Sequence, residues 1–287
     1  MRFCLLLLAA CSAFAQAPAF EVASIKRSEP LTPELVQSGR VHIGVSLDNR
    51  SVRIGQLTLA ELVTIAYQLK PYQLSAPQWT STVRFDVQAK LPDGATRGQV
   101  PAMMQTLLAE RFGLKIHREQ RELSALALVQ TKDGQKLKPS PADAEPKPAS
   151  PQIRGGTNVG SDGSQVHSGP DGESRITRRP DGGEHAEVKK MTMAAFAGFL
   201  YRFCDRPVFD LTGVTGRYDA EFDISREEIR NAARSHGYAI KTDAETSDPT
   251  GPTLKASLET LGLRLEGRKL PIEVVVVDAA EKVPTEN

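Results

Sequence analysis

The residues best suited to recognition chemistry are an arginine and an aspartate on either side of an aromatic residue, a motif that occurs twice. Arg84-Phe85-Asp86 and Arg217-Tyr218-Asp219 both lie in segments with the alternating pattern of a strand. In a strand the arginine and the aspartate share one face, and the aromatic ring points to the other. One interpretation is an aromatic core anchor with an ion pair on the solvent side, and the other is two equivalent recognition spots for a partner peptide or glycan. The candidate binding residues are therefore Arg84, Asp86, Arg217 and Asp219.

His117 and Cys204 are the other candidates for catalytic or metal-binding groups. His117 lies next to Arg118-Glu119, but no second and third ligand stand at the spacing of a zinc site. Cys204 ends an apolar helix face, which favours burial as a small hydrophobic side chain over use as a nucleophile. The sequence also contains no nucleophile elbow, phosphate loop or dinucleotide fingerprint. We therefore predict no catalytic residue, no cofactor and no metal, which favours a protein that is not an enzyme.

Longer blocks of sequence recur in the same order and predict an internal repeat. Leu57–Leu62 is matched by Met191–Phe196, and Phe112–Ile116 is matched by Leu261–Leu265. Matching blocks in one order are typical of a repeated structural unit. We therefore expect the two halves of the chain to share one arrangement of strands and helices.

Composition excludes one class of partner. Lysine plus arginine (36) nearly equal aspartate plus glutamate (35), and aromatic residues make up only 6% of the chain. Phosphate binding needs a basic excess, and stacking on single strands needs aromatic surface. We expect no nucleic-acid partner. The hydrophobic content of 40% is that of a globular protein with a real core.

The N-terminus has the pattern of a signal peptide. Arg2 precedes the apolar stretch Phe3–Ala10, and Ala15-Gln16-Ala17 fits a small-x-small cleavage site. We expect residues 1–17 to be removed and the protein to be periplasmic or extracellular. An alternative is lipoprotein processing at Cys11, which follows Leu8-Ala9-Ala10. No later apolar run is long enough for a membrane span, so we expect none in the mature chain.

Helix and strand signals mark out the elements that would position these residues. Thr58 with Glu61 forms a capping box ahead of an apolar helical face, and Gly113 is a natural end for a second helix. Thr192 begins the matching helix of the second half. The strands expected in the first half are residues 20–26, 40–47, 51–54, 72–74, 84–89, 114–117 and 123–131. Those expected in the second half are residues 174–179, 185–190, 208–209, 217–224, 263–266 and 272–278.

A change of composition divides the chain. Residues 139–183 are rich in proline, glycine and serine with almost no large apolar side chains, so they are predicted to be a linker. The expected organisation is a signal peptide (1–17), a first αβ repeat unit (18–138), the linker (139–183) and a second αβ repeat unit (184–287). The predicted fold class is α+β: two tandem, internally repeated αβ units with helices packed on mixed or antiparallel sheets. Whether the halves form two domains or one body is left open.

Several motifs together resemble a large family of paralogous bacterial proteins. They include Phe20–Lys26, Leu107–Phe112, Lys136–Ser140, Asp205–Val208 and Thr212–Asp219. The chain is similar over its whole mature length to the soil-associated bacterial protein family, a domain family of unknown function. The resemblance implies export. Related domains attached to membrane-bound metallopeptidase sensors of the antibiotic-response type also imply an extracytoplasmic sensing or binding role. The resemblance assigns no site residues.

A fainter resemblance concerns the order of elements in each half. A helix, a strand pair, a helix ending in Gly-Leu and a final strand are similar to the small αβ modules at the N-terminus of secretins and TonB-dependent receptors. The resemblance implies a protein–protein docking module, although a fold analogy alone does not establish function.

Two functions follow from these observations. The first is a non-catalytic binding, docking or sensing module of the bacterial envelope, whose partner is an envelope or extracellular protein or polymer. An open sheet edge that accepts a strand would be its structural mark. The alternative is a hydrolase of unknown class acting on cell-wall or environmental polymers. It would show a cleft where His117, Cys204 or several carboxylates converge with shifted pKa values. The sequence carries no signal for the oligomeric state.

Overall fold

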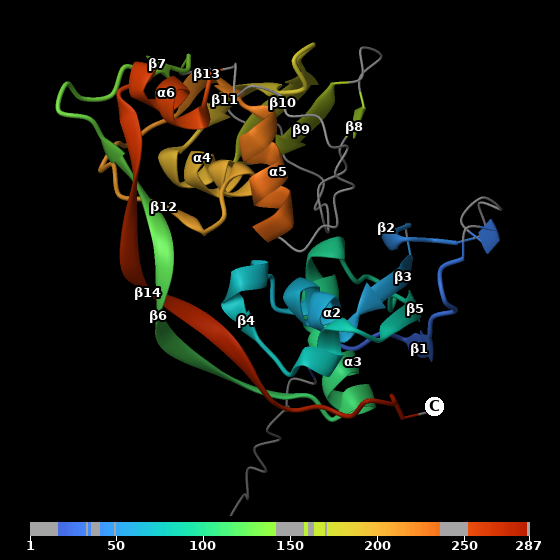
Figure 1. The fold of residues 1–287 in the computed structure, drawn as a ribbon. Coiled ribbons are helices and arrows are strands. Elements are labelled where there is room, and N and C mark those ends of the chain that lie inside the picture. Colours follow the sequence, from blue (N-terminus) through green and yellow to red (C-terminus); the bar gives the residue numbers. More distant parts are fainter. Residues whose placement is uncertain are drawn as a thin grey trace, which may run out of the picture. The chain divides into compact units, whose positions relative to one another are not determined.

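The computed structural model divides the chain into two compact units (Figure 1). Unit 1 comprises Met1–His117 and Val275–Asn287, and unit 2 comprises Arg118–Val274. The described residues are 17–32, 34–35, 41–48, 50–141, 158–159, 164–169, 171–235 and 252–285. The predicted signal peptide lies almost wholly outside the described residues, as do Cys11 and much of the predicted linker. The divisions fall inside two strands, so each unit contains chain from both halves of the sequence.

Unit 1 is built on an antiparallel sheet with the strand order β1-β5-β3-β2. The strands are β1 (Val22–Arg27), β2 (Gly44–Leu47), β3 (Ser51–Thr58) and β5 (Arg84–Lys90). Along β5, Phe85, Val87 and Ala89 are buried while the residues between them are exposed or half-buried. This period of two places one face of the sheet in the core and leaves the other toward solvent.

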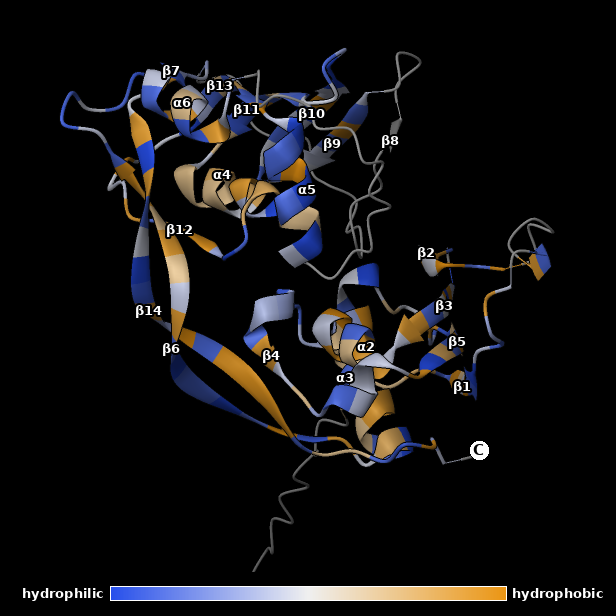
Figure 2. Ribbon diagram, in the orientation of Figure 1, coloured by the Kyte–Doolittle hydropathy of each residue, from blue (hydrophilic) through white to orange (hydrophobic). Residues whose placement is uncertain are grey.

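Two helices cover the buried face of this sheet. Helix α2 (Leu59–Ala66) begins at Thr58 with the predicted capping box to Glu61, and α3 (Val100–Phe112) ends at Gly113 in the left-handed conformation (φ 55°). Figure 2 shows the hydrophobic residues along α3. Phe112 packs edge-on against Phe85 with ring centroids 5.0 Å apart. This contact joins the end of the helix to the centre of the sheet.

Short 3-10 helices connect these elements. They are η1 (Pro71–Gln73), η2 (Gln78–Ser81) and η3 (Arg97–Gln99). The expectation of an extended 72–74 segment was wrong for Tyr72 and Gln73, because proline at the first position of η1 favours a helical turn. Only β4 (Leu74–Ser75) is extended.

Unit 2 contains a six-stranded sheet with the order β7-β13-β11-β10-β9-β8. Its strands are β7 (Lys138–Pro139), β8 (Asn158–Val159), β9 (Gln165–Gly169), β10 (Gly172–Arg178), β11 (Glu184–Met191) and β13 (Tyr218–Ile224). Strands β8 and β9 lie in the range predicted as a linker, which is a correction for those residues, whereas β10 confirms the strand expected at residues 174–179. Polar composition did not exclude strands there, because Ser174 and Ile176 alternate as buried residues with exposed neighbours.

Helices α4 (Met193–Leu200), α5 (Arg226–Ser235) and α6 (Leu254–Thr260), with the 3-10 turn η4 (Tyr201–Phe203), complete unit 2. Phenylalanines form the centre of its core: Phe222 on the sheet meets Phe196, Phe199 and Phe203 edge-on at centroid distances of 5.5–6.5 Å. The α+β class is therefore confirmed in both units. No helix within the described ranges is long and apolar enough to cross a membrane.

A third sheet has the order β12-β6-β14-β4 and contains two long strands, β6 (Lys115–Gln130) and β14 (Leu263–Ala279). The sequence predicted a break in each, at 118–122 and 267–271, and both predictions were wrong. The middle of each strand is mostly exposed, so the burial alternation that marks a strand is missing there. Backbone pairing between strands needs no buried face, and ion pairs such as Arg118–Glu273 line these segments.

The two short strands of this sheet make matched parallel pairs. In unit 1, β4 pairs with β14 through Leu74↔Val275, and in unit 2, β12 (Val208–Asp210) pairs with β6 through Val208↔Leu126. Strand β6, from the first half of the sequence, thus contributes most of its residues to unit 2. Strand β14, from the second half, contributes its last residues to unit 1. The duplication that would explain this exchange stays a prediction.

Candidate functional site

The first arginine–aspartate motif stabilises an irregularity in β3. The register of β3 with β5 shifts between Ile54 and Leu57, and Gln56 inside the shift has a left-handed backbone (φ 60°). Asp86 Oδ1 accepts hydrogen bonds from the Gln56 backbone N–H (2.9 Å) and from Ser28 Oγ (2.6 Å). Arg84 Nη1 donates to the Gln56 carbonyl at 2.5 Å. We call Ser28, Gln56, Arg84 and Asp86 the first clamp.

The second motif makes the same bonds in unit 2. The register of β11 with β13 shifts between Val188 and Met191, and Lys190 has φ 55°. Asp219 Oδ1 accepts from the Lys190 N–H (2.9 Å) and from Ser140 Oγ (2.5 Å), and Arg217 Nη1 donates to the Lys190 carbonyl (2.6 Å). We call Ser140, Lys190, Arg217 and Asp219 the second clamp.

The clamps explain why these residue types occur together. A left-handed residue other than glycine is strained, and its N–H and carbonyl leave the regular ladder at a bulge. The aspartate and the arginine satisfy these two backbone groups. Desolvation acts against ionisation of Asp219, but the bonds from Ser140 and Lys190 and the charges of Lys138 and Lys189 lower its pKa below the ordinary value. The predicted aromatic anchor is seen at Phe85, which is buried.

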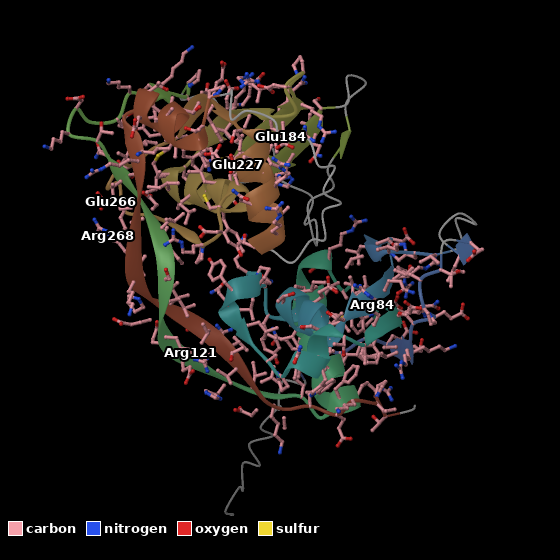
Figure 3. The ribbon with its side chains drawn as sticks, in the orientation of Figure 1. Arg84, Arg121, Glu184, Glu227, Glu266 and Arg268 are labelled. Carbon is pink, nitrogen blue, oxygen red and sulfur yellow. The ribbon has the colours of Figure 1, made fainter. Side chains whose placement is uncertain are left out.

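A groove of about 660 Å³ lies beside the first clamp in unit 1. Lys26, Asp86, Gln88 and Arg53 line it from strands β1, β5 and β3, where Lys26 is the register partner of Asp86 and Arg53 that of Gln88. These four side chains form one polar patch, because register partners and residues two apart share a sheet face. Figure 3 labels Arg84 of the first clamp, which marks the part of unit 1 where the groove lies.

The wall of the groove comes from the last residue of β1 and the chain that follows it. It includes Arg27, Glu29, Leu35, Val41 and His42. Gly55 permits this arrangement, since a Cβ atom at that position would lie 1.9 Å from the His42 carbonyl oxygen. No sequence pattern indicates that these segments meet.

Two buried polar atoms, on residues that line the groove, lack a partner among the described residues. Gln56 is only 3% exposed, and its Nε2 donates to the Glu29 carbonyl at 2.8 Å. That bond fixes the orientation of the amide, because a flipped amide would place two oxygens together. Gln56 Oε1 is then a buried acceptor with no hydrogen-bond donor among the described residues, and His42 Nε2 is likewise without a partner. Such atoms cost about 1–3 kcal/mol each unless water or a ligand satisfies them.

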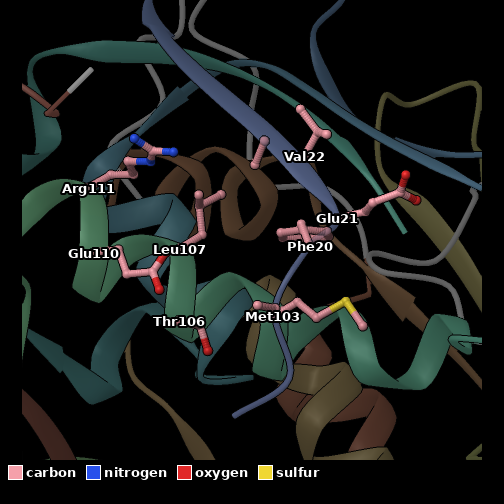
Figure 4. A pocket seen from close by; sticks show the side chains of 10 residues that line it. Phe20, Glu21, Val22, Met103, Thr106, Leu107, Glu110 and Arg111 are labelled. Carbon is pink, nitrogen blue, oxygen red and sulfur yellow. The ribbon is translucent and has the colours of Figure 1, made fainter. Parts of the chain in front are cut away.

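A second, smaller cavity in unit 1, of about 250 Å³, lies between the N-terminal segment and α3 (Figure 4). Phe20, Met103 and Leu107 line it, with Glu110 and Arg111 at one side. Thr106 Oγ1 donates to the Pro18 carbonyl at 2.9 Å, which ties the segment to the helix. No orphaned polar atom is among the described lining residues, so this cavity offers less to a ligand than the groove.

The residues weighed as catalytic groups have other partners. His117 Nδ1 lies 2.7 Å from Asp278 Oδ1 on an exposed part of unit 1. Cys204 is 7% exposed in unit 2, and burial, with the neighbouring Asp205 and Glu228 charges, raises its pKa to about 12. A thiol with this pKa is almost wholly protonated at neutral pH and is a poor nucleophile.

The charged residues on β6 and β14 form local ion pairs. Arg268 Nη2 donates to Glu266 Oε2 at 2.7 Å, and Arg121 pairs with Glu119 at the corresponding place on β6 (Figure 3). Both are exposed pairs two residues apart, which contribute little to stability. Among the described residues, no group of three or more histidine, cysteine, aspartate or glutamate side chains could hold a metal ion.

Comparison with known families identifies the chain over most of its length. Residues 60–280 match the family described as "Protein of unknown function (DUF3738)". The chain belongs to this family. No curated protein matches it, and no solved structure does. The matched region of this DUF3738 protein includes Arg84, Asp86 and all four residues of the second clamp, whereas Ser28 and Gln56 of the first clamp precede it.

Proposed function

We propose that this DUF3738 protein is a non-catalytic binding module, exported to the bacterial envelope or beyond, and that the groove beside the first clamp is its binding site. The observation that carries the proposal is Gln56 Oε1, a buried acceptor without a donor among the described residues, on a residue that lines the groove. A ligand that donates a hydrogen bond to Gln56 Oε1 would remove the free-energy cost of the orphaned atom, which favours ligand binding in the groove.

The architecture around the groove supports this proposal. Asp86 and Arg84 bind the backbone of Gln56, and Ser28 in turn binds Asp86. These bonds of the first clamp fix the position of Gln56 before any ligand binds. A preorganised group binds with a smaller loss of conformational entropy than a mobile one. Strand addition at the edge strands β1 and β2, a route expected from the sequence, stays a prediction.

The hydrolase alternative receives less support from the same residues. His117 Nδ1 is paired with Asp278 on an exposed part of unit 1, and the pKa of Cys204 is raised to about 12, opposite to the shift that a nucleophile needs. Among the carboxylates of the described residues, only Glu184 has a raised pKa: burial raises the pKa, while Arg202 and Arg178 act in the opposite sense. It stands in β11 and lines neither the groove nor the cavity beside α3.

A ligand-screening experiment tests the proposal. The purified, 15N-labelled protein is titrated with a panel of neutral, acidic and basic fragments of fewer than about 15 heavy atoms, and amide shifts are recorded. We expect the fragments that bind to shift the backbone signals of Gly55 and Gln56 and the side-chain amide signals of Gln56. The proposal is wrong if no fragment shifts these signals, or if shifts gather only at Cys204 and its neighbours.

A further inference from the structure

We infer that the ligand of the groove is an acidic peptide segment in an extended conformation, with one backbone N–H bonded to Gln56 Oε1 and a carboxylate on the groove's cations. The inference rests on the proposed function and names the ligand class for the same site. It combines three features of the groove: its unpaired cations, its orphaned acceptor and its aliphatic wall.

The charges of the groove favour an anion. Lys26, Arg27 and Arg53 line it, all three are exposed, and none forms an ion pair with another described residue. Glu29 and Asp86 supply the opposing carboxylates, but Asp86 Oδ1 is already engaged by two donors of the first clamp. An arginine presents paired N–H groups that match a carboxylate, so a ligand carboxylate has a ready partner.

The acceptor adds a second requirement. An anion alone cannot satisfy Gln56 Oε1, because an amide oxygen accepts a hydrogen bond and donates none. The ligand therefore carries an N–H or O–H donor as well as a negative charge. A peptide supplies a backbone N–H at every residue other than proline and a carboxylate at every aspartate or glutamate.

The apolar part of the wall favours a peptide over an acidic sugar. Leu35 and Val41 offer aliphatic surface, and the described lining residues include no phenyl, phenol or indole ring. Aliphatic surface stabilises the burial of a leucine or valine side chain by about 25 cal/mol per Å². The volume of about 660 Å³ fits a segment of a few residues rather than a single amino acid.

Binding of defined peptides tests the inference. The probe is a fluorescein-labelled acetylated tetrapeptide of alternating leucine and glutamate, measured by fluorescence anisotropy at low and at physiological salt. The matched control peptide has lysine in place of glutamate, and tri-galacturonate competes as an acidic sugar. We expect the glutamate peptide to bind at least about tenfold more tightly than the lysine peptide. Competition by tri-galacturonate is expected to be weaker than competition by unlabelled glutamate peptide.

The most informative variant is Gln56→Lys. Lysine occupies the same left-handed bulge position in unit 2, as Lys190, so the backbone conformation suits it. Because Gln56 is buried and Lys190 is half-buried, thermal unfolding first checks that the variant folds. The variant removes the acceptor and adds a positive charge. If charge alone determined affinity, the glutamate peptide would bind this variant more tightly. We instead expect the affinity of the glutamate peptide to fall about fivefold. Arg53→Gln should weaken binding by a similar factor and reduce its salt dependence, and Lys115→Gln, an equal charge change on exposed β6, should leave it within about twofold.

Each outcome decides something. Stronger binding by Gln56→Lys, equal binding of the two peptides, or tighter binding of tri-galacturonate would overturn the acidic-peptide inference. If fragments still shift the Gln56 signals in that case, the groove remains a binding site for another ligand class. If neither fragments nor peptides shift them, the orphaned acceptor holds water only, and the proposed function falls with the inference.

Discussion

The two clamps share their hydrogen bonds but not the side chains beside them. In unit 1, Arg53 lies three residues before the left-handed Gln56, and its register partner is Gln88. In unit 2, Glu187 lies three residues before the left-handed Lys190, and its register partner is Glu221. Glu187 and Glu221 thus face each other as like charges, where unit 1 pairs a cation with an amide. The left-handed residue itself is a buried glutamine in unit 1 and a lysine in unit 2.

This contrast separates structure from function. The aspartate, the arginine and the serine do the same work in both units, so their recurrence needs no ligand to explain it. The neutral buried acceptor and the cation Arg53 occur in unit 1 alone of the two matched positions, whereas Lys26 is matched in unit 2 by Lys138, the register partner of Asp219. A shared structural duty does not account for Gln56 Oε1 and Arg53. Binding chemistry therefore belongs to the residues that differ.

The largest effect is expected from charges placed in the exchanged strands. Val275 is fully buried in unit 1 and Leu126 is buried in unit 2, although each comes from the opposite half of the sequence. Val275→Asp should destabilise unit 1 by at least about 3 kcal/mol, because it buries an unpaired charge, and Leu126→Asp should do the same to unit 2. Hydrogen exchange resolved by residue measures both. Loss of protection in the wrong unit would contradict the exchange.

Removing either clamp aspartate should have a smaller and equal effect. Asp86→Ala and Asp219→Ala each delete an acceptor of two hydrogen bonds and leave a strained residue unsupported. Bonds to charged groups contribute about 1.5–3 kcal/mol, so we expect a loss of about 2–3 kcal/mol in each case, measured by urea unfolding. Arg84→Ala and Arg217→Ala should follow in parallel at about 1–2 kcal/mol. A large effect in one unit and none in the other would break the comparison.

Acid should weaken the second clamp in a defined direction. The pKa of Asp219 is lower in the folded protein than its ordinary value of 3.8, so the folded state binds protons less readily than the unfolded state. The ionised carboxylate therefore contributes stability above about pH 3.8 that is lost as the pH falls through the lowered value. Asp219→Asn should flatten this part of the stability profile, as followed by urea midpoints between pH 2 and pH 6. A profile unchanged by the substitution would show that Asp219 is not the titrating group.

The smallest effect distinguishes the two left-handed residues. Glycine adopts positive φ without strain, so Lys190→Gly should stabilise unit 2 by about 0.5–1 kcal/mol. Gln56→Gly gains the same relief and removes the orphaned Oε1, but it loses the Nε2 bond to the Glu29 carbonyl and the buried contacts of the side chain, so its net effect should be close to zero. Thermal unfolding of the two variants measures the difference. Equal stabilisation by both would mean that the Gln56 side chain contributes nothing to the fold.

Sequence patterns predicted the elements whose signals are local. The capping box of Thr58 and Glu61, the cap at Thr192 and the left-handed Gly113 are formed as expected, because each depends on neighbours within a few residues. The continuous strands β6 and β14 were missed, since their middle residues lie exposed and are held by backbone pairing that leaves no pattern in side chains.

The candidate site was only half visible in the sequence. Arg84, Asp86, Arg217 and Asp219 stood out because they recur, yet their described bonds go to the backbone of the two bulges and, for the aspartates, to a serine hydroxyl. Gln56 carries no motif, and its burial depends on Glu29 and His42, which meet it only in the folded chain. A binding site formed by such long-range contacts is visible in the structure but cannot be predicted from the spacing of residues in the sequence.

The most direct test of the account is a comparison of the two bulges in one titration. The 15N-labelled protein is titrated with the leucine–glutamate peptide, and the signals of Gly55 and Gln56 are followed beside those of Lys189 and Lys190. We predict saturable shifts at the first pair and none at the second, with both clamps intact. Shifts of equal size at both pairs, or at Lys189 and Lys190 alone, would contradict the claim that binding belongs to the residues in which the two units differ.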